Sequence, residues 1–325
     1  MNAVISRHLH PETAPCSTSL CTGDDMARIR IAAGGIGFNF LPVYVAEREH
    51  LFAENGLAVE TNLLPSVDKA TAAVKDGICD IAITPPEGAI RDAVAGGSLR
   101  VIAANVNRLP LSLIAQPRFK RIEDLKGAVL GTSSLTEGTA LYTMEVLRQH
   151  GLHYPGDYTF NVVGLHPARW KALQEGAIDA AVQLIPLNFI AEDAGFGNLG
   201  EVTDYIPEIA FTALIVGRKW AESNRRSVVA FLRSLILATD WMYDPANDAA
   251  LLALMAEVIH AEGKYGRQSL DYLRSRSVFP RDLSIPRAAF AKTVELMRKA
   301  GFPEAEAARA STVLDDTYRA DAVAA

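Results

Sequence analysis

The stretch KDGICDIAIT at residues 75–84 returns in altered form as QEGAIDAAVQ at residues 174–183, 99 positions later. In each copy a glycine ends a helical segment, and the apolar run that follows predicts a buried strand. At the same offset Gly34 corresponds to Ser133, and each of these residues stands between an expected strand and an expected helix. An offset that recurs at two separate elements indicates two similarly built lobes.

Strands and helices alternate around both copies. Strands are expected at residues 28–33, 57–64, 79–84 and 99–106 around the first copy, and at residues 127–132, 159–165 and 178–183 around the second. The segments between them have the apolar spacing of helices, including one helix over residues 40–56, and Ser133 or Ser134 is expected to cap the helix before Gly151. This alternation is typical of parallel α/β sheets.

The character of the chain changes after a further expected strand at residues 211–217. Long segments with helical spacing follow, separated by Pro245, Pro280, Pro286 and Pro303. The sequence therefore predicts an α/β protein of two lobes with a helical C-terminal extension. We expect residues 1–27 to form a disordered tail, residues 28–112 with 212–325 to form lobe I, and residues 113–211 to form lobe II.

The composition excludes several classes of function. The chain has 325 residues, a formal net charge of −6 and no basic stripe, so a nucleic-acid partner is not expected. No apolar run is long enough to span a membrane. No export signal is visible in residues 1–25, and Met26 is an alternative start. Cys16 and Cys21 are a weak zinc signal without further ligands, so neither a metal nor a cofactor is expected.

A ligand site is expected where the strands end at their carboxyl edges and the helices begin. Glycines let backbone N–H groups approach a ligand, and the amides and hydroxyls there can hydrogen-bond it. Serine also serves as a helix cap, and Glu87 either favours the start of its own helix or pairs with a cationic group. The candidate ligand-binding residues are Gly35, Gly37, Phe38, Asn39, Thr84, Pro85, Glu87, Ser133, Ser134, Thr136, Gln183 and Asn188.

A dinucleotide site fits the first loop poorly. The segment GIGFNF at residues 35–40 supplies two glycines of the G-x-G-x-x-G pattern, but Phe40 stands where the third is needed. The chain has no P-loop, HExxH or GxSxG motif, and no catalytic residue is assigned.

Several of these segments resemble the NMT1/THI5-like family of nitrate-, sulfonate- and taurine-type solute-binding proteins. They are GFNFLPVYVAEREHLFAENGLAVE at 37–60, AVKDGICDIAITPPEGAI at 73–90, RIEDLKGAVLGTSSLTEGTALY at 121–142 and ALQEGAIDAAV at 172–182. The resemblance implies a type II periplasmic-binding fold that closes by hinge motion, with crossing strands near 111–116 and 210–217.

The same resemblance implies a function. A member of this family would deliver a small organic anion, a sulfonate or a pyrimidine-like ligand to an ABC permease from the periplasm. The alternative is a cytoplasmic enzyme on the same fold, such as a pyrimidine synthase, a decarboxylase or a desulfinase. A desulfinase would need a cysteine in the first loop, where this chain has glycine and phenylalanine, so an enzyme would depend on Glu87, Glu137 or a histidine.

Overall fold

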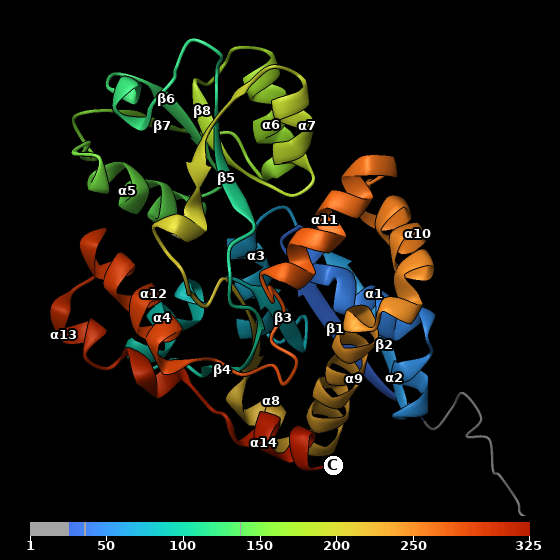
Figure 1. Ribbon diagram of the computed structural model, residues 1–325. Coiled ribbons are helices and arrows are strands. Elements are labelled where there is room, and N and C mark those ends of the chain that lie inside the picture. The colour runs from blue at the N-terminus through green and yellow to red at the C-terminus, as the bar shows by residue number, and fades with distance from the viewer. Residues whose placement is uncertain (1–25, 36, 137) are drawn as a thin grey trace, which may run out of the picture.

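The computed structural model describes residues 26–35, 37–136 and 138–325 (Figure 1). Most of the tail expected at residues 1–27, with Cys16 and Cys21, lies outside these ranges, as does Glu137. Two five-stranded sheets form the centres of two lobes, one above the other in Figure 1.

The two sheets have the same plan. The first has the order β2-β1-β3-β10-β4 and the second the order β7-β6-β8-β5-β9, so that β10 and β5 occupy equivalent places. Each of these two strands runs antiparallel to both of its neighbours, while β1 and β6 run parallel to theirs. The equivalence confirms the internal repeat.

The strands agree with the sequence-based expectations, and β9 is additional. Its segment GNLGE lacks apolar alternation and is a strand because it pairs with the buried β5. The strands are β1 (Ala27–Ala33), β2 (Leu57–Leu63), β3 (Ile81–Thr84), β4 (Leu99–Val106), β5 (Leu111–Ala115), β6 (Val129–Thr132), β7 (Thr159–Val162), β8 (Ala180–Leu184), β9 (Gly197–Glu201) and β10 (Thr212–Gly217).

The chain passes between the sheets twice. It leaves β4 in the first sheet to form β5 in the second, and it returns from β9 to form β10 in the first sheet. The strands that follow these two passages, β5 and β10, are the crossing strands that the family resemblance implies. The assignment of residues 28–112 and 212–325 to one lobe and 113–211 to the other stays a prediction.

Helices cover both sheets, and the C-terminal ones surround the lower lobe in Figure 1. The α-helices are α1 (Leu41–Arg48), α2 (Leu51–Glu54), α3 (Val67–Lys75), α4 (Glu87–Val94), α5 (Thr139–Gln149), α6 (His166–Gln174), α7 (Leu187–Asp193), α8 (Arg218–Ser223), α9 (Arg225–Tyr243), α10 (Asp248–Ile259), α11 (Gly263–Ser275), α12 (Arg287–Lys299), α13 (Glu304–Ala307) and α14 (Thr317–Ala324). Short 3-10 helices occur at Phe38–Phe40, Ile122–Leu125, Val202–Asp204, Pro245–Asn247 and Ala310–Val313.

Two helix predictions are wrong in detail. The single helix expected over residues 40–56 is divided at His50, whose φ of 58° is left-handed, and the turn directs Phe52 into the core against Phe231. Helix α5 begins at Thr139 with Gly138 as its cap. Neither Ser133 nor Ser134 caps it, because the hydroxyl of Thr132 donates to the carbonyl of Ser134 and holds an extra turn before the helix.

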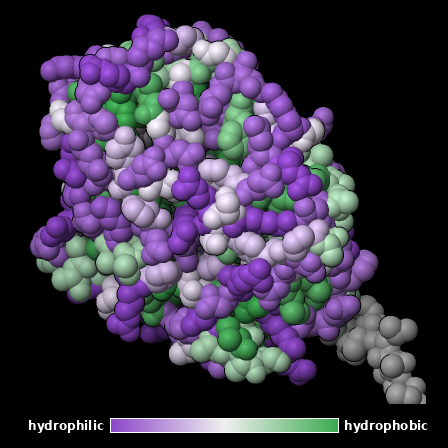
Figure 2. Space-filling model, in the orientation of Figure 1, coloured by the Kyte–Doolittle hydropathy of each residue, from purple (hydrophilic) through white to green (hydrophobic). Residues whose placement is uncertain are grey.

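Figure 2 shows a mostly hydrophilic face with small, separate hydrophobic groups, one of them near α8 and α14 at the bottom of the view. Within the described ranges, no helix combines the length and the apolar character needed to cross a bilayer.

Candidate functional site

A cavity of about 890 Å³ lies at the carboxyl edges of the two sheets. Both lobes contribute to its walls, and the end of α10 adds Val258, Ile259 and His260. The first lobe contributes the loops after β1, β2 and β3, and the second contributes the loops after β6, β7 and β8. The cavity therefore occupies the place where α/β proteins of this topology bind ligands.

The two lobes touch beside this cavity at Gly35. A Cβ atom built on Gly35 would lie 2.4 Å from Cδ1 of Leu165, which belongs to the other lobe. Gly34 is confined too, since its Cβ would lie 2.5 Å from the backbone of Val67. These loops need glycine for close approach, and no pyrophosphate is needed to explain them.

The structure brings many of the candidate residues together. The cavity wall includes Gly35, Gly37, Phe38, Asn39, Thr84, Pro85 and Ser133. Their contact with a ligand stays a prediction. The other five candidates, which are not among the residues that line the cavity, are Glu87, Ser134, Thr136, Gln183 and Asn188.

These five residues make structural hydrogen bonds nearby. Glu87 is fully buried, and its Oε1 accepts a hydrogen bond from the backbone N–H of Gly138 in the other lobe, 3.2 Å away. Asn188 donates from Nδ2 to Oγ of Ser112 at 3.0 Å. The amide of Gln183, oriented to satisfy both of its groups, spans two backbone atoms of α6 and thus fixes the start of that helix. Ser134 and Thr136 share a 3.3 Å contact between their hydroxyls.

Arg169 is a charged residue in the cavity wall that the sequence-based candidates omit. Its side chain is only 1% exposed, and Nη1 donates to the carbonyl of Val182 at 3.1 Å. Among the described residues, Nε has no hydrogen-bond partner and the guanidinium makes no ion pair with a carboxylate. Burial lowers the pKa of Arg169 to about 9, so the group is still cationic at neutral pH.

His166 lies on the same helix, three residues before Arg169, and also lines the cavity. Its Nδ1 accepts a hydrogen bond from the backbone N–H of Leu184 at 3.2 Å. Burial, with the charge of Arg169, lowers the pKa of His166 well below its ordinary value. His166 is therefore neutral and carries its proton on Nε2, which makes that atom a donor.

Some of the cavity-lining residues absent from the candidate list were predictable from the sequence. The loops at residues 63–67 and 165–169 also follow strands at the carboxyl edges, and Val67 and His166 are separated by the same 99 residues. The contribution of Val258–His260 had no such signal, because it depends on where a helix of the C-terminal extension packs.

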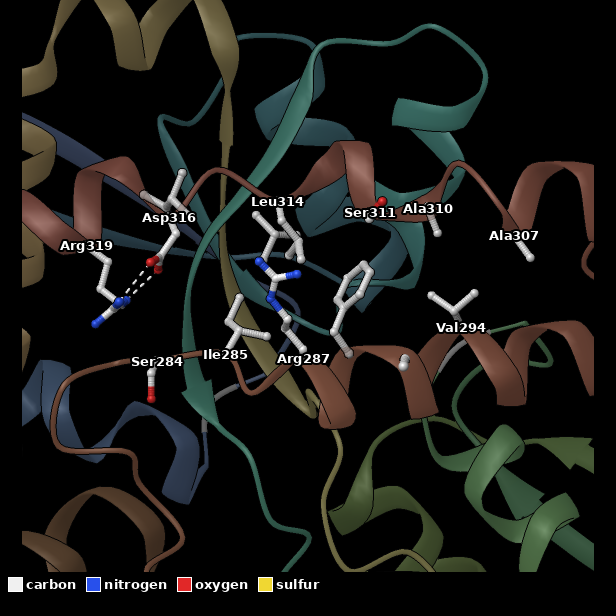
Figure 3. Close-up of a pocket in the computed structure, with 14 residues that line it drawn as sticks. Ser284, Ile285, Arg287, Val294, Ala307, Ala310, Ser311, Leu314, Asp316 and Arg319 are labelled. Carbon is white, nitrogen blue, oxygen red and sulfur yellow. Dashed lines mark hydrogen bonds and ion pairs between the residues drawn. The ribbon is translucent and has the colours of Figure 1, made fainter.

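A second cavity, of about 680 Å³, lies among C-terminal elements (Figure 3). Phe290 and Val294 of α12 and Leu314 give it apolar walls, and Arg319 at its edge is paired with Asp316. It does not lie at the carboxyl edge of either sheet. The interlobe cavity is the better candidate, because it combines that position with a buried unpaired cation.

Known structures share this fold over nearly the whole chain. A protein from Bordetella bronchiseptica is 21% identical, with a TM-score of 0.73, and the match covers 92% of this chain and 97% of that one. The periplasmic aliphatic sulphonate-binding protein of Escherichia coli is 18% identical over 84% of this chain and 91% of its own, with a TM-score of 0.65. The periplasmic nitrate-binding protein of Synechocystis PCC 6803 is 11% identical over 92% and 89%, with a TM-score of 0.71.

These similarities define the class: an α/β protein with the two-lobed periplasmic-binding fold. The family model described as NMT1/THI5 like matches residues 37–249, and this chain belongs to that family. No curated protein sequence matches the chain significantly.

Proposed function

We propose that this chain is a solute-binding protein that encloses a small organic anion between its lobes and delivers it to an ABC-type permease. Arg169 carries the proposal. Burying a charge without a partner costs several kcal/mol, and proteins retain such a cost where a bound ligand offsets it. An anion beside Arg169 would supply the missing charge.

The similar structures support the same class of ligand. The Escherichia coli protein is named for aliphatic sulphonates and the Synechocystis protein for nitrate, and both ligands are anions. Both proteins are periplasmic by name, and a periplasmic location is part of the proposal. The expectation that Glu87 faces a cationic ligand loses support, since its Oε1 is bonded to Gly138.

Thermal unfolding with candidate anions tests this proposal. The protein is heated with millimolar benzenesulfonate, methanesulfonate or nitrate, and the ligand is then measured by ion chromatography. We expect at least one anion to raise the melting temperature, because a ligand at a hundred times its Kd adds about 2.7 kcal/mol of stability. We also expect full recovery of that ligand. Absence of any shift, or consumption of the ligand, contradicts the proposal.

A further inference from the structure

We infer that the ligand is an organic monoanion with a bulky apolar body, such as an arenesulfonate or arenecarboxylate. This inference rests on the proposed function and names the class of solute. A bare inorganic anion and a zwitterion with an ammonium group are the two classes that it excludes.

Among the described residues, the walls of the cavity carry one permanent charge. Arg169 is the cationic side chain among the described residues that line it, and none of those residues is Asp, Glu or Lys. The neutral His166 adds an N–H donor on the same helix. A guanidinium with a neighbouring N–H donor fits one oxyanion group, and within these described walls nothing complements an ammonium.

The cavity is far larger than a single anionic group requires. At about 30 Å³ per water molecule, the cavity of about 890 Å³ would hold roughly thirty waters. Cavities of about 300–1,000 Å³ are typical for organic ligands of drug-like size. A nitrate-sized ion would leave most of this space to water or empty.

The remaining walls are mainly apolar and come from both lobes. Phe38 and Phe211 lie stacked, with ring centroids 6.4 Å apart and planes at 8°, and both border the cavity. Ile83 stands on the first lobe, and Leu187 and Ile190 stand on α7 of the second. Apolar walls favour a ligand that removes their area from water, and aromatic rings favour a flat body. A ligand of this kind contacts both lobes and thereby stabilises closure.

Isothermal titration with a series of anions tests the inference. The series keeps the head group and changes the body: methanesulfonate, 2-aminoethanesulfonate, benzenesulfonate and naphthalene-1-sulfonate, with nitrate as the bare ion. We expect the aromatic members to bind with a Kd about tenfold or more below that of methanesulfonate, because each buries several more apolar carbons. We expect 2-aminoethanesulfonate to bind more weakly than the aromatic members.

A variant of the apolar wall distinguishes contacts with the apolar body of the ligand from contacts with its sulfonate group. Leu187→Ala removes part of the apolar wall, and Leu237→Ala is the control, because Leu237 is 41% exposed on α9 away from the cavity. Leu187→Ala should weaken naphthalene-1-sulfonate by about tenfold and leave methanesulfonate nearly unchanged. Leu237→Ala should change neither.

The outcomes distinguish this inference from the proposed function. If nitrate or methanesulfonate binds as tightly as the aromatic anions, or if Leu187→Ala weakens all sulfonates equally, the bulky-body inference is wrong while anion binding stands. If the wild-type protein binds none of the anions, the proposed function is wrong and the inference falls with it.

Discussion

The buried carboxylate of Glu87 accepts a hydrogen bond from the backbone N–H of Gly138 across the gap between the two lobes, with 3.2 Å between Oε1 and N. Glu87 begins α4 beside the first sheet, and Gly138 caps α5 beside the second. Its other oxygen, Oε2, has no partner among the described residues. The contact joins the two lobes, and the ionisable carboxyl group of Glu87 is buried away from water.

The burial of Glu87 makes stability depend on pH. Burial raises the pKa of Glu87 to about 7, against 4.5 in the unfolded chain. Since the folded pKa is the higher one, the group destabilises the fold progressively as the pH rises from about 4.5 to about 7. The difference corresponds to about 3 kcal/mol at 1.36 kcal/mol per pKa unit.

The variant Glu87→Gln keeps an acceptor for Gly138 and removes the titration. We expect Glu87→Gln to gain stability relative to the wild type as the pH rises from 4.5 to 8. Urea unfolding of both proteins at pH 5 and pH 8 measures the difference. A stability difference that is the same at both pH values would show that Glu87 does not titrate in this range.

Glu145 on α5 forms a second link, to the C-terminal helix α12. Its carboxylate lies 3.0 Å from Nζ of Lys299 and 3.5 Å from Nζ of Lys292, and it also bonds Arg148. Burial alone would raise its pKa, but the bonds to Arg148 and Lys299 outweigh it and lower the pKa to about 2.

The pH dependence of Glu145 has the opposite sign. Because the folded pKa is depressed, its stabilising effect is present above about pH 4.5 and is lost as the pH falls toward 2. Glu145→Gln should cost about 2 kcal/mol at pH 7, because Arg148, Lys292 and Lys299 lose a buried carboxylate, and much less at pH 2.5. The two lysines keep their ion pairs with Glu295 in the variant. Denaturant unfolding at the two pH values measures this. An equal cost at both would mean that packing, and not charge, holds α12 to α5.

Gly35 and Leu165 allow a direct test of lobe closure. Gly35→Ala places a Cβ 2.4 Å from Cδ1 of Leu165, so closure must push that side chain aside at a cost of about 1–3 kcal/mol. We expect weaker ligand binding, because the bound form must keep this contact. Leu165→Ala combined with Gly35→Ala should recover part of the affinity, as measured in a double-mutant cycle by calorimetry. Strictly additive effects would show that the two residues do not meet in the bound form.

The fold follows from the sequence because its signals are local and are repeated. The copies at 75–84 and 174–183 predict equivalent strands, and β3 and β8 occupy equivalent places in the two sheets. The break at His50 was not predictable from helical spacing alone, because the apolar pattern continues through it.

The candidate site was only partly predictable. The loops after the strands were the right region, and Ser133 and Asn39 line the cavity. Arg169 was not predictable as a site residue, because an arginine in the polar segment HPARWK is expected on the exposed face of a helix. Its burial depends on how α6 packs against β8, which is a tertiary relationship. Gln183 lies near the carboxyl end of β8, beside one of the expected loops, but its amide bonds the backbone of α6. The composition of the segment does not predict this partner.

The affinity of Arg169→Met for benzenesulfonate tests the central claim most directly. The matched control is Arg226→Met, since Arg226 is exposed on α9 and does not line the cavity. A hydrogen bond to a charged group contributes about 1.5–3 kcal/mol, so we expect Arg169→Met to weaken binding by roughly 10- to 150-fold. We expect the ligand-free variant to be at least as stable as the wild type, because a buried unpaired charge is gone. If Arg169→Met binds as well as the wild type and Arg226→Met, Arg169 does not hold the anion and the account is contradicted.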